Sequence, residues 1–197
     1  MKGRKPNILG HEKSFKSAVL LPLVEYRGNT CILFEKRSGF LYRQPGEICF
    51  PGGKMESTDG GALQTARRET EEELGLSKED LVIIAPLDIL VTPFNTIVYP
   101  FLSQIKDHSK IQPTNEVESV FYVPLDFLLR AEPIDSSTEI KLLPPENFNY
   151  ELIPNGVNYG WRGGVYPVYF YIWEDRVIWG MTARILRHFI DLYREVG

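Results

Sequence analysis

The stretch that decides the fold is GGKMESTDGGALQTARRETEEELGL, residues 52–76. Residues 61–74 predict one helix, and Gly75 directly after them is a residue type that ends helices by adopting a left-handed backbone. At about 3.6 residues per turn, four small or apolar side chains of this helix fall on one narrow face. We expect that face to be buried, and its members are Leu63, Ala66, Thr70 and Leu74.

Three glutamates flank the buried face. Glu69 lies three residues before Glu72 and four before Glu73, so the three side chains are neighbours on the helix surface. Like-charged neighbours cost about 0.2–0.5 kcal/mol per pair, and the negative end of the helix dipole adds to that cost. A hard divalent cation, which takes oxygen ligands, would turn the cost into binding. Since the glycines at 52–53 also let backbone approach a ligand closely, the pattern favours a cation site over a solvated acidic helix face.

The composition is that of a globular protein. The chain has 197 residues, 43% hydrophobic and 24% charged, which predicts a single domain over residues 1–197. The net charge of −4 gives no general attraction for nucleic acid or for an anionic membrane, so we expect neither as a partner. Cys31 and Cys49 are too few for a disulfide framework, and we expect them to be reduced core thiols.

The N-terminal residues 1–14 are polar and contain no apolar signal segment. No apolar run in the chain reaches the roughly 18 residues that a membrane-spanning helix requires. We therefore expect a cytoplasmic protein with a polar N-terminal tail, and we leave its association into a homodimer open.

The rest of the chain predicts strands and two further helices. Residues 17–26 and 30–36 predict two strands joined by a turn at 27–29, and Pro22 is expected to place the first strand at a sheet edge. Residues 131–164 are rich in proline, asparagine and glycine and predict a long irregular insertion. The predicted class is α/β (α+β), and its remaining elements are strands at 47–50, 80–91, 96–105, 117–123 and 165–172 and helices at 124–129 and 178–195.

The acidic helix also carries a family pattern. Residues 68–76, RETEEELGL, resemble the second half of the Nudix hydrolase signature, Gly-x5-Glu-x7-Arg-Glu-U-x-Glu-Glu-x-Gly-U, where U is apolar. The first half departs, because Asp59 stands in place of Glu and eight residues instead of seven separate it from Arg68. The extra residue lies before the helix, so the helical acids stay in register. The resemblance implies the Nudix fold, a mixed β-sheet sandwiched between helices.

A second pattern narrows the resemblance to the coenzyme A diphosphatase (CoA pyrophosphatase) subfamily. Residues 33–38, LFEKRS, and 45–54, PGEICFPGGK, are similar to the extra signature of that subfamily, and residues 178–186, IWGMTARIL, are similar to its final helix. Glu35 replaces a threonine of the signature, and Tyr42 replaces an arginine with Arg43 beside it. The positions that match are Arg37, Ser38, Gly46, Phe50, Pro51, Gly52 and Gly53.

The resemblance implies a reaction and a cofactor. Nudix enzymes hydrolyse a diphosphate joined to another group, and for coenzyme A the products are 3′,5′-ADP and 4′-phosphopantetheine or its acylated form. A divalent cation neutralises the phosphate charge and activates the attacking water. Carried over by position, the ligands of Mg²⁺ or Mn²⁺ are the Gly52 carbonyl and the carboxylates of Glu69, Glu72 and Glu73.

The same resemblance implies roles for other side chains. Arg68 is expected to orient the glutamates through ion pairs. Glu116 is the favoured general base, with Glu118 as the neighbouring acid before the same strand. The expected substrate contacts are Arg37, Ser38, Arg43, Gly53 and Lys54.

Two other functions stay open. Tyr42 in place of arginine is compatible with a pyrophosphatase acting on ADP-ribose or another nucleoside diphosphate derivative. A non-catalytic nucleotide-binding domain is the second, although such domains usually lose the helical acids that this chain keeps. The nucleotide or pantetheine end of the substrate is expected at residues 155–160 or in the aromatic stretch 159–173, for which core packing is the competing role.

Overall fold

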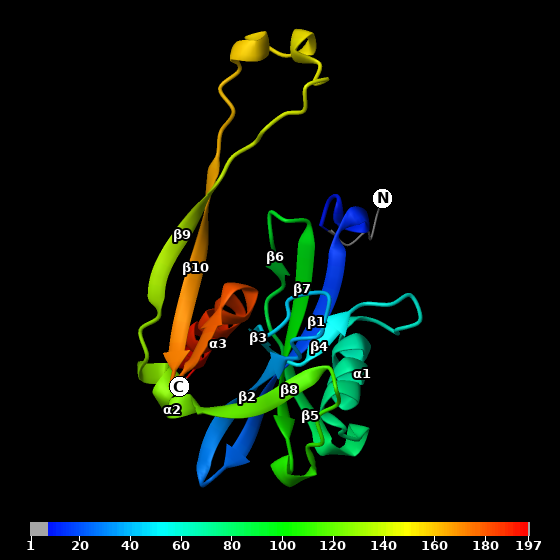
Figure 1. Cartoon of the computed structure of the whole chain (residues 1–197), viewed down its shortest axis with the longest axis vertical. Helices are drawn as coiled ribbons and strands as arrows, with labels where there is room; N and C mark the ends of the chain where they lie inside the picture. The colour runs from blue at the N-terminus through cyan, green and yellow to red at the C-terminus, as the bar shows by residue number, and fades with distance from the viewer. Residues whose placement is uncertain (1–7, 197) are drawn as a thin grey trace.

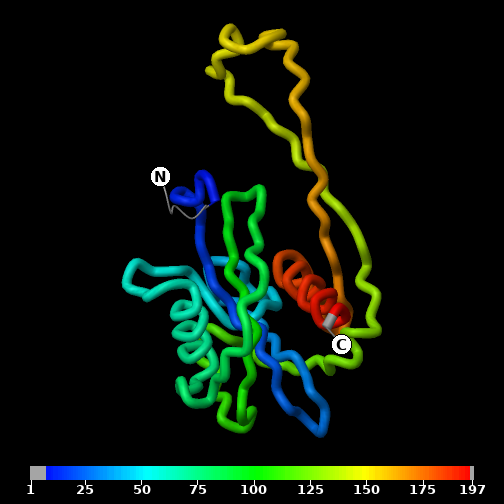
Figure 2. The backbone as a smooth tube through the Cα atoms, turned by 180° about the vertical axis from the view of Figure 1, so that it is seen from behind, coloured from blue at the N-terminus to red at the C-terminus, as the bar shows by residue number. Residues whose placement is uncertain are grey.

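The computed structural model describes residues 8–196, so residues 1–7 of the expected polar tail lie outside the described residues. A mixed β-sheet forms the centre of the body, and helices cover both of its faces (Figures 1 and 2). This confirms the expected α+β fold with a sheet between helices. In the described residues the α-helices are α1 (Ala62–Leu74), α2 (Leu125–Arg130) and α3 (Gly180–Val196). None of them is long and apolar enough to cross a membrane.

The central sheet has eight strands within residues 8–196, and its main path runs β3-β2-β1-β7-β5. Strand β1 pairs in parallel with β7 and antiparallel with β2 and β4, so it lies at the centre of the sheet. Strand β6 adds to β7, and β8 adds to β2. The strands are β1 (Phe15–Tyr26), β2 (Asn29–Arg37), β3 (Ile48–Cys49), β4 (Gly52–Lys54), β5 (Leu81–Pro86), β6 (Leu90–Val91), β7 (Thr96–Ile105) and β8 (Val117–Pro124).

The turn between β1 and β2 is confirmed as a tight hairpin. Tyr26 pairs with Asn29, and the two residues between them, Arg27 and Gly28, have positive φ angles of 51° and 79°. A two-residue turn of this kind matches the twist of the flanking strands, and glycine adopts it without strain. The turn therefore fixes the register of β2 against β1.

The expectation that Pro22 places β1 at an edge is wrong. On one side of β1, the pairing with β4 ends at Val19 and the pairing with β2 begins at Leu23. The N–H of Leu20 points to this side, because it donates to the carbonyl of Pro51. Backbone groups alternate along a strand, so the nitrogen of Pro22 faces the gap between β4 and β2, where no ladder donor is needed.

Helix α1 forms where the sequence predicts it. Gly75 follows its last residue with a left-handed φ of 65°, as expected for a glycine that ends a helix. Ala66, Thr70 and Leu74 are fully buried, whereas Leu63 is only partly buried. The face that the sequence marks as apolar is thus the face that packs on the sheet.

Each face of the sheet has its own hydrophobic core. Ala66 and Leu74 of α1 pack with Leu33 of β2 on one face. Phe34, the next residue of β2, packs with Leu186 of α3 on the opposite face. Successive side chains of a strand point to opposite faces, so one strand supplies both cores. The two cores fix α1 and α3 relative to β1 and β2.

Two further expectations need correction at their boundaries. Residues 80–91 do not form one strand, because a bulge between Ile83 and Ala85 bends β5 and the proline at its end has no N–H for the ladder. The last helix begins at Gly180, not at residue 178. Ile178 belongs to strand β11 (Arg176–Trp179), which pairs with β10 (Gly164–Trp173).

Residues 131–164 are not irregular throughout. Strand β9 (Ile134–Ile140) pairs antiparallel with β10, and with β11 they form a second sheet of three strands. Beyond the pair Ile140–Gly164, residues 141–163 extend away from the body as the tip of a long arm (Figures 1 and 2). The expectation is therefore wrong for β9. Its sequence IDSSTEI is polar and almost fully exposed, so it shows no apolar alternation, and the pairing with β10 makes it a strand.

The tip of the arm packs on itself. The ring of Phe148 lies 5.1 Å from that of Tyr150 and 5.3 Å from that of Trp161, and Tyr159 lies 5.0 Å from Trp161, all edge-on. These rings link two short 3-10 turns, Tyr150–Leu152 and Gly156–Asn158. The tip thus has a small aromatic cluster of its own.

Replacing residues 141–163 by Asn-Gly should leave the body folded. Strands β9 and β10 would then meet in a two-residue turn of a type that suits antiparallel strands. We expect the thermal midpoint to change by no more than a few degrees. Circular dichroism on heating measures it, with the intact chain as control, and loss of the cooperative transition would show that the tip supports the body.

Candidate active site

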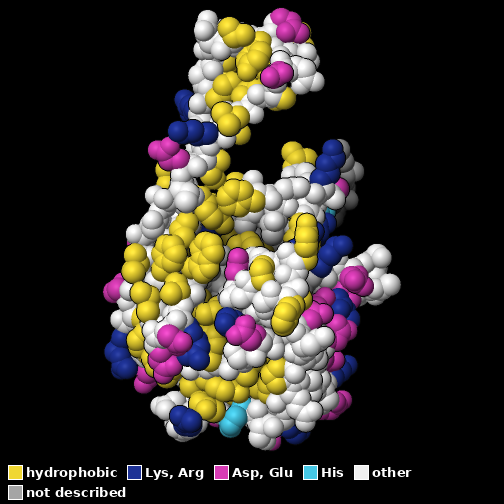
Figure 3. Space-filling model, in the orientation of Figure 1, with side chains coloured by type: hydrophobic (Ala, Val, Ile, Leu, Met, Phe, Trp, Pro, Cys, Tyr) yellow, Lys and Arg dark blue, Asp and Glu magenta, His cyan; other side chains and the backbone are white. Residues whose placement is uncertain are grey.

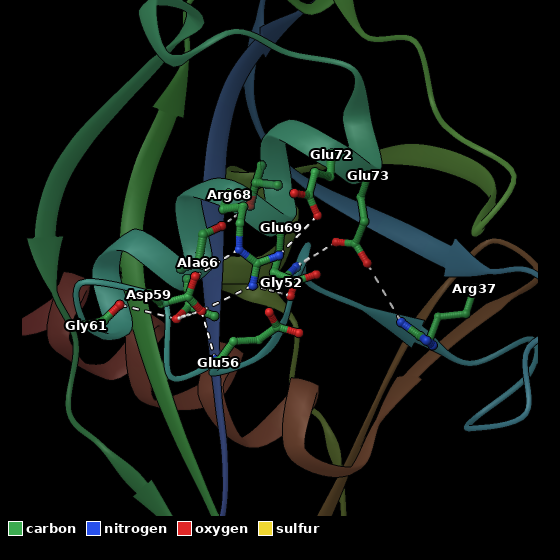
Figure 4. A network of polar contacts seen from close by, with 12 residues as sticks. Arg37, Gly52, Glu56, Asp59, Gly61, Ala66, Arg68, Glu69, Glu72 and Glu73 are labelled. Carbon is green, nitrogen blue, oxygen red and sulfur yellow. Dashed lines mark hydrogen bonds and ion pairs between the residues drawn. The ribbon is translucent and has the colours of Figure 1, made fainter.

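Helix α1 lies against strand β4, and this contact builds the site (Figure 4). The N–H of Gly52 donates to Glu73 Oε2 at 2.8 Å. Gly52 has a φ of 146°, and a Cβ there would lie 2.3 Å from the carbonyl oxygen of Ala18 and 2.6 Å from Cα of Val19 on β1. Only glycine therefore allows β4 to lie so close to β1 and still present its N–H to the helix.

Gly53 makes room for a second carboxylate. A Cβ on Gly53 would lie 2.4 Å from the carboxyl carbon of Glu69 and within 2.7 Å of both its oxygens. The Glu69 carboxylate therefore rests directly on the backbone of Gly53. The two glycines serve different contacts, because Gly52 meets the backbone of β1 and Gly53 meets a helical acid.

Arg68 ties the acids of the helix to the loop before it. Its guanidinium lies 2.8 Å from Glu69 and 3.1 Å from Glu72, and Nε donates to Asp59 at 2.9 Å (Figure 4). The expected ion pairs between Arg68 and the glutamates are therefore present. Glu72 is the most exposed of these acids, since 61% of its side chain is accessible.

Asp59 anchors Arg68 and is not free to act as a ligand. Its carboxylate accepts hydrogen bonds from the backbone N–H of Glu56 at 2.9 Å and the hydroxyl of Thr65 at 2.7 Å, besides two from Arg68. These donors, with Arg68 foremost, hold the pKa of Asp59 well below its usual range. The residue at which this chain departs from the family signature thus has a structural role in holding the loop to the helix.

Glu73 is the buried acid of the site. Its side chain is 6% accessible, and Arg37 Nη1 on β2 is 3.9 Å from its Oε1. Burial, and next the negative charge of Glu35, raise the pKa of Glu73 to about 9, against the N–H of Gly52, which lowers it. Burial also raises the pKa of Glu69. The site therefore has more negative charge than Arg37 and Arg68 balance.

Glu35 is a buried acid that the sequence analysis did not assign to the site. It is fully buried on β2, its Oε1 accepts from Cys49 Sγ at 3.2 Å, and its Oε2 has no hydrogen-bond partner. Burial raises the pKa of Glu35 to about 7. A signal was present in the sequence, because Glu35 continues the alternation of Cys31 and Leu33 and so had to face α1. Cys31 and Cys49 are both free; Cys31 is buried in the core as expected, whereas Cys49 is only partly buried.

The residues fit a divalent cation in donor type. Carboxylate and backbone oxygens are the hard ligands that Mg²⁺ and Mn²⁺ accept, and the backbone of Gly53 lies directly against the Glu69 carboxylate. Within residues 8–196, however, no three His, Cys, Asp or Glu side chains already converge as a cation site. In this arrangement Arg68 pairs with Glu69 and Glu72, and the N–H of Gly52 donates to Glu73.

Three other expected site residues, Glu116, Ser38 and Lys54, differ in their burial and contacts. Glu116 is exposed, its carbonyl accepts the N–H of Ser38 at 2.8 Å, and its charge acts on Glu35. Ser38 is buried and its hydroxyl lies 3.5 Å from the N–H of Phe40, so it shapes a turn. Lys54 is exposed at the end of β4. Their contacts with a substrate stay predictions.

Neither Arg43 nor the arm contacts the carboxylates of α1 within the described residues. The guanidinium of Arg43 lies 5.5 Å from the ring centroid of Phe15. Residues 155–160, expected near the nucleotide or pantetheine end, lie at the tip of the arm, away from α1 (Figure 1). In the aromatic stretch, Tyr171 is in the core and Trp173 packs against it, which is the competing role.

Comparison with known proteins gives the family. The model of the NUDIX domain matches residues 14–143. The chain belongs to the Nudix family. The matched segment contains β1–β8, α1 and the carboxylate cluster, so the family match covers the whole site described above.

Relatives of this Nudix chain include two proteins named coenzyme A diphosphatases. It is 37% identical over 123 residues to the peroxisomal coenzyme A diphosphatase NUDT7 of Mus musculus, covering 62% of this chain and 52% of the relative. It is 30% identical over 182 residues to the mitochondrial coenzyme A diphosphatase NUDT8 of Homo sapiens, covering 89% and 68%. The chain spans about half the length of several curated relatives that it matches.

Solved structures support the fold. A MutT/nudix family protein from Enterococcus faecalis has a TM-score of 0.54 at 13% identity, covering 98% of this chain and 66% of that protein. At this identity the likeness concerns the fold alone. The α+β architecture of the described residues is thus that of a Nudix domain.

Alanine at each glycine of the pair should have a different effect in this Nudix domain. Gly52→Ala places a Cβ against the backbone of β1 and should lower the thermal midpoint. Gly53→Ala meets only the end of the Glu69 side chain, so the fold should persist while the affinity for Mn²⁺ falls on the order of tenfold or more. Thermal unfolding and calorimetry with Mn²⁺ measure the two effects.

Gly60→Ala is the matched control, because its Cβ would meet only Gln64 at 3.6 Å. It should change neither quantity. Equal thermal midpoints for Gly52→Ala and Gly60→Ala would contradict the steric argument, and unchanged Mn²⁺ affinity for Gly53→Ala would contradict the role of Glu69.

Proposed function

We propose that this chain hydrolyses the diphosphate of coenzyme A or its derivatives with a divalent cation bound at α1. The observation that carries the proposal is the placement of the Glu69 and Glu73 carboxylates against the backbone of Gly52 and Gly53. The names of the two coenzyme A diphosphatases among its relatives support the substrate.

The reaction adds water across the P–O–P bridge. The water oxygen bonds to one phosphorus, the bond from that phosphorus to the bridging oxygen breaks, and the bridging oxygen leaves with the other phosphate. The products are 3′,5′-ADP and 4′-phosphopantetheine, or its acyl form when the substrate is acylated. Glu69, Glu72, Glu73 and the Gly52 carbonyl would hold Mg²⁺ or Mn²⁺, which supplies charge neutralisation and an activated water when bound.

Arg37 is the best-placed cation for a phosphate oxygen. It lies beside Glu73 on β2, and its Nε is buried without a hydrogen-bond partner among the described residues. A planar guanidinium donates two parallel hydrogen bonds to phosphate oxygens. The other candidates are secondary. Gly53 is covered by Glu69, Ser38 and Arg43 make the contacts given above, and Lys54 is exposed at the end of β4.

A substrate panel tests the proposal. The purified chain is assayed with Mn²⁺ or Mg²⁺ against coenzyme A, an acyl-coenzyme A, oxidised coenzyme A, ADP-ribose and NADH, and products are separated by chromatography. We expect coenzyme A or a derivative to give the highest kcat/KM, with 3′,5′-ADP as a product. A clear preference for ADP-ribose would support the alternative that Tyr42 keeps open, and no hydrolysis of any compound would support a non-catalytic nucleotide-binding domain.

Glu73→Gln should remove nearly all turnover and leave the fold intact. Glutamine has the same shape and still accepts the N–H of Gly52, but it lacks the charge that binds a cation. We expect kcat to fall about a hundredfold or more, with an unchanged thermal midpoint. Glu79→Gln on the exposed surface is the control, and turnover retained by Glu73→Gln would refute the assignment of Glu73 as a ligand.

Glu116→Gln tests the general base. The charge of Glu116 acts on Glu35 of the site, and a general base is required for the attack of water, so we expect a lower kcat. Glu118→Gln is the matched control two residues further along the chain, on β8, where Glu118 is paired with Lys36 at 2.6 Å. An unchanged kcat for Glu116→Gln would assign the base elsewhere.

Location and assembly stay predictions. The relatives named above are called peroxisomal and mitochondrial, whereas the sequence of this chain suggests the cytoplasm. Cell fractionation tests the location, and light scattering tests whether the chain forms a homodimer.

A further inference from the structure

A second polar cluster lies near the start of helix α3. The hydroxyl of Thr182, in the first turn of α3, donates to the carbonyl of Ile48 on β3 at 3.3 Å. Cys49, the next residue of β3, contacts Glu35, and Gly52 follows three residues later. The start of α3 and the carboxylate site therefore both contact the same short strand, β3.

Arg184 is the central residue of this cluster. Its guanidinium carbon lies 4.6 Å from the ring centroid of Tyr166 at the base of the arm. Its Nη1 is buried without a hydrogen-bond partner, and no carboxylate of the described residues lies within ion-pair distance of Arg184. The Arg184 side chain as a whole is half-buried, but a polar atom that is buried without a hydrogen bond is costly, so Nη1 calls for a partner.

Tyr166 and Phe94 complete the cluster. The hydroxyl of Tyr166 is also buried without a partner, so it is a second free donor beside Arg184. Phe94, in the turn between β6 and β7, meets the ring of Tyr166 edge-on at 5.2 Å and is 64% exposed. Figure 3 shows the surface hollowed between the arm and the body. The cluster thus offers two donors for an anion and an exposed ring for a planar group.

We propose that Arg184 and Tyr166 bind a phosphomonoester of the substrate, and that Phe94 packs against its base. The identification of this group as the 3′-phosphate of coenzyme A rests on the proposed function. A guanidinium and a hydroxyl suit a phosphate, because both donate and the guanidinium also supplies charge. Bases stack on exposed aromatic rings. The subsite distinguishes coenzyme A from diphosphates such as ADP-ribose that lack the extra phosphate.

A purely packing role explains less of the geometry. The stacking of Arg184 on Tyr166 is a favourable cation–π contact in itself. It leaves both Nη1 of Arg184 and the hydroxyl of Tyr166 without partners. The proposed phosphate would supply a partner for each of these groups.

Binding of nucleotides tests the subsite without any turnover. Calorimetry on the whole chain compares 3′,5′-ADP with 5′-AMP, which differ by the one phosphate. We expect 3′,5′-ADP to bind on the order of tenfold more tightly, and Arg184→Gln to abolish the difference with an unchanged thermal midpoint. Tyr166→Phe, which keeps the ring, should reduce it. Equal affinities in the intact chain, or a difference that survives in Arg184→Gln, would overturn the proposal.

Arg187→Gln is the matched control. Arg187 lies on the same helix, but its guanidinium is paired with Asp191 at 3.2 Å, so this variant should keep the preference for 3′,5′-ADP. Loss of the preference in Arg187→Gln to the same extent would show a general effect of helix charge and would overturn the assignment to Arg184.

Turnover separates this inference from the proposed function. Coenzyme A and dephospho-coenzyme A share the diphosphate but differ in the 3′-phosphate, so Arg184→Gln should raise KM for coenzyme A about tenfold and leave dephospho-coenzyme A unaffected. Cleavage of both at equal kcat/KM by the intact chain would overturn the subsite alone. Absence of cleavage, with the preference for 3′,5′-ADP retained, would overturn the proposed function alone.

Discussion

The absence of a side chain at Gly52 is the constraint on which the site depends. The N–H of Gly52 reaches Glu73 only because the backbone of β4 lies very close to that of β1. A Cβ on Gly52 would collide there with the backbone of Ala18 and Val19. That hydrogen bond joins the C-terminal half of α1 to the sheet. It also fixes the rotation of the helix, so that Glu69 settles on Gly53 while Ala66 and Leu74 enter the core.

Charge balance explains the second feature of the site. Arg68 lies among Asp59, Glu69 and Glu72, and Arg37 lies beside Glu73, with Glu35 buried behind it. Two cations thus face five carboxylates. The arrangement is stable only while some acids are protonated or a further positive charge is present, which is the physical reason that a divalent ion suits it.

The sequence was sufficient for the parts of the fold that local chemistry determines. The C-terminal end of α1 followed from Gly75, and the β1–β2 turn followed from Gly28, because glycine conformations are local properties. Strand β9 was missed because its polar residues become a strand only by pairing with β10. The prediction that Pro22 places β1 at a sheet edge was wrong for a related reason. The gap between β4 and β2 that accommodates Pro22 depends on how separate strands pair with β1.

The site shows the same division. The helical acids and the glycine pair were readable from spacing, because one helix and one adjacent strand carry them. Glu35 was not assigned, although its alternation with Leu33 was visible, since its proximity to Glu73 comes from the packing of α1 on β2. The contact between Arg184 and Tyr166 could not be predicted from the sequence, because it forms only where the arm meets α3.

The parallel pairing of β1 with β7 has a consequence for how the protein acquires its structure. Phe15 pairs with Thr96, and the segment between them contains α1 and the glycine pair of β4. The β1–β2 hairpin closes a short loop, whereas the β1–β7 ladder closes a long one and bears a larger entropic cost. Formation of this ladder is therefore a slow step by topology, and during synthesis the carboxylate helix emerges before the strand that locks the sheet beneath it.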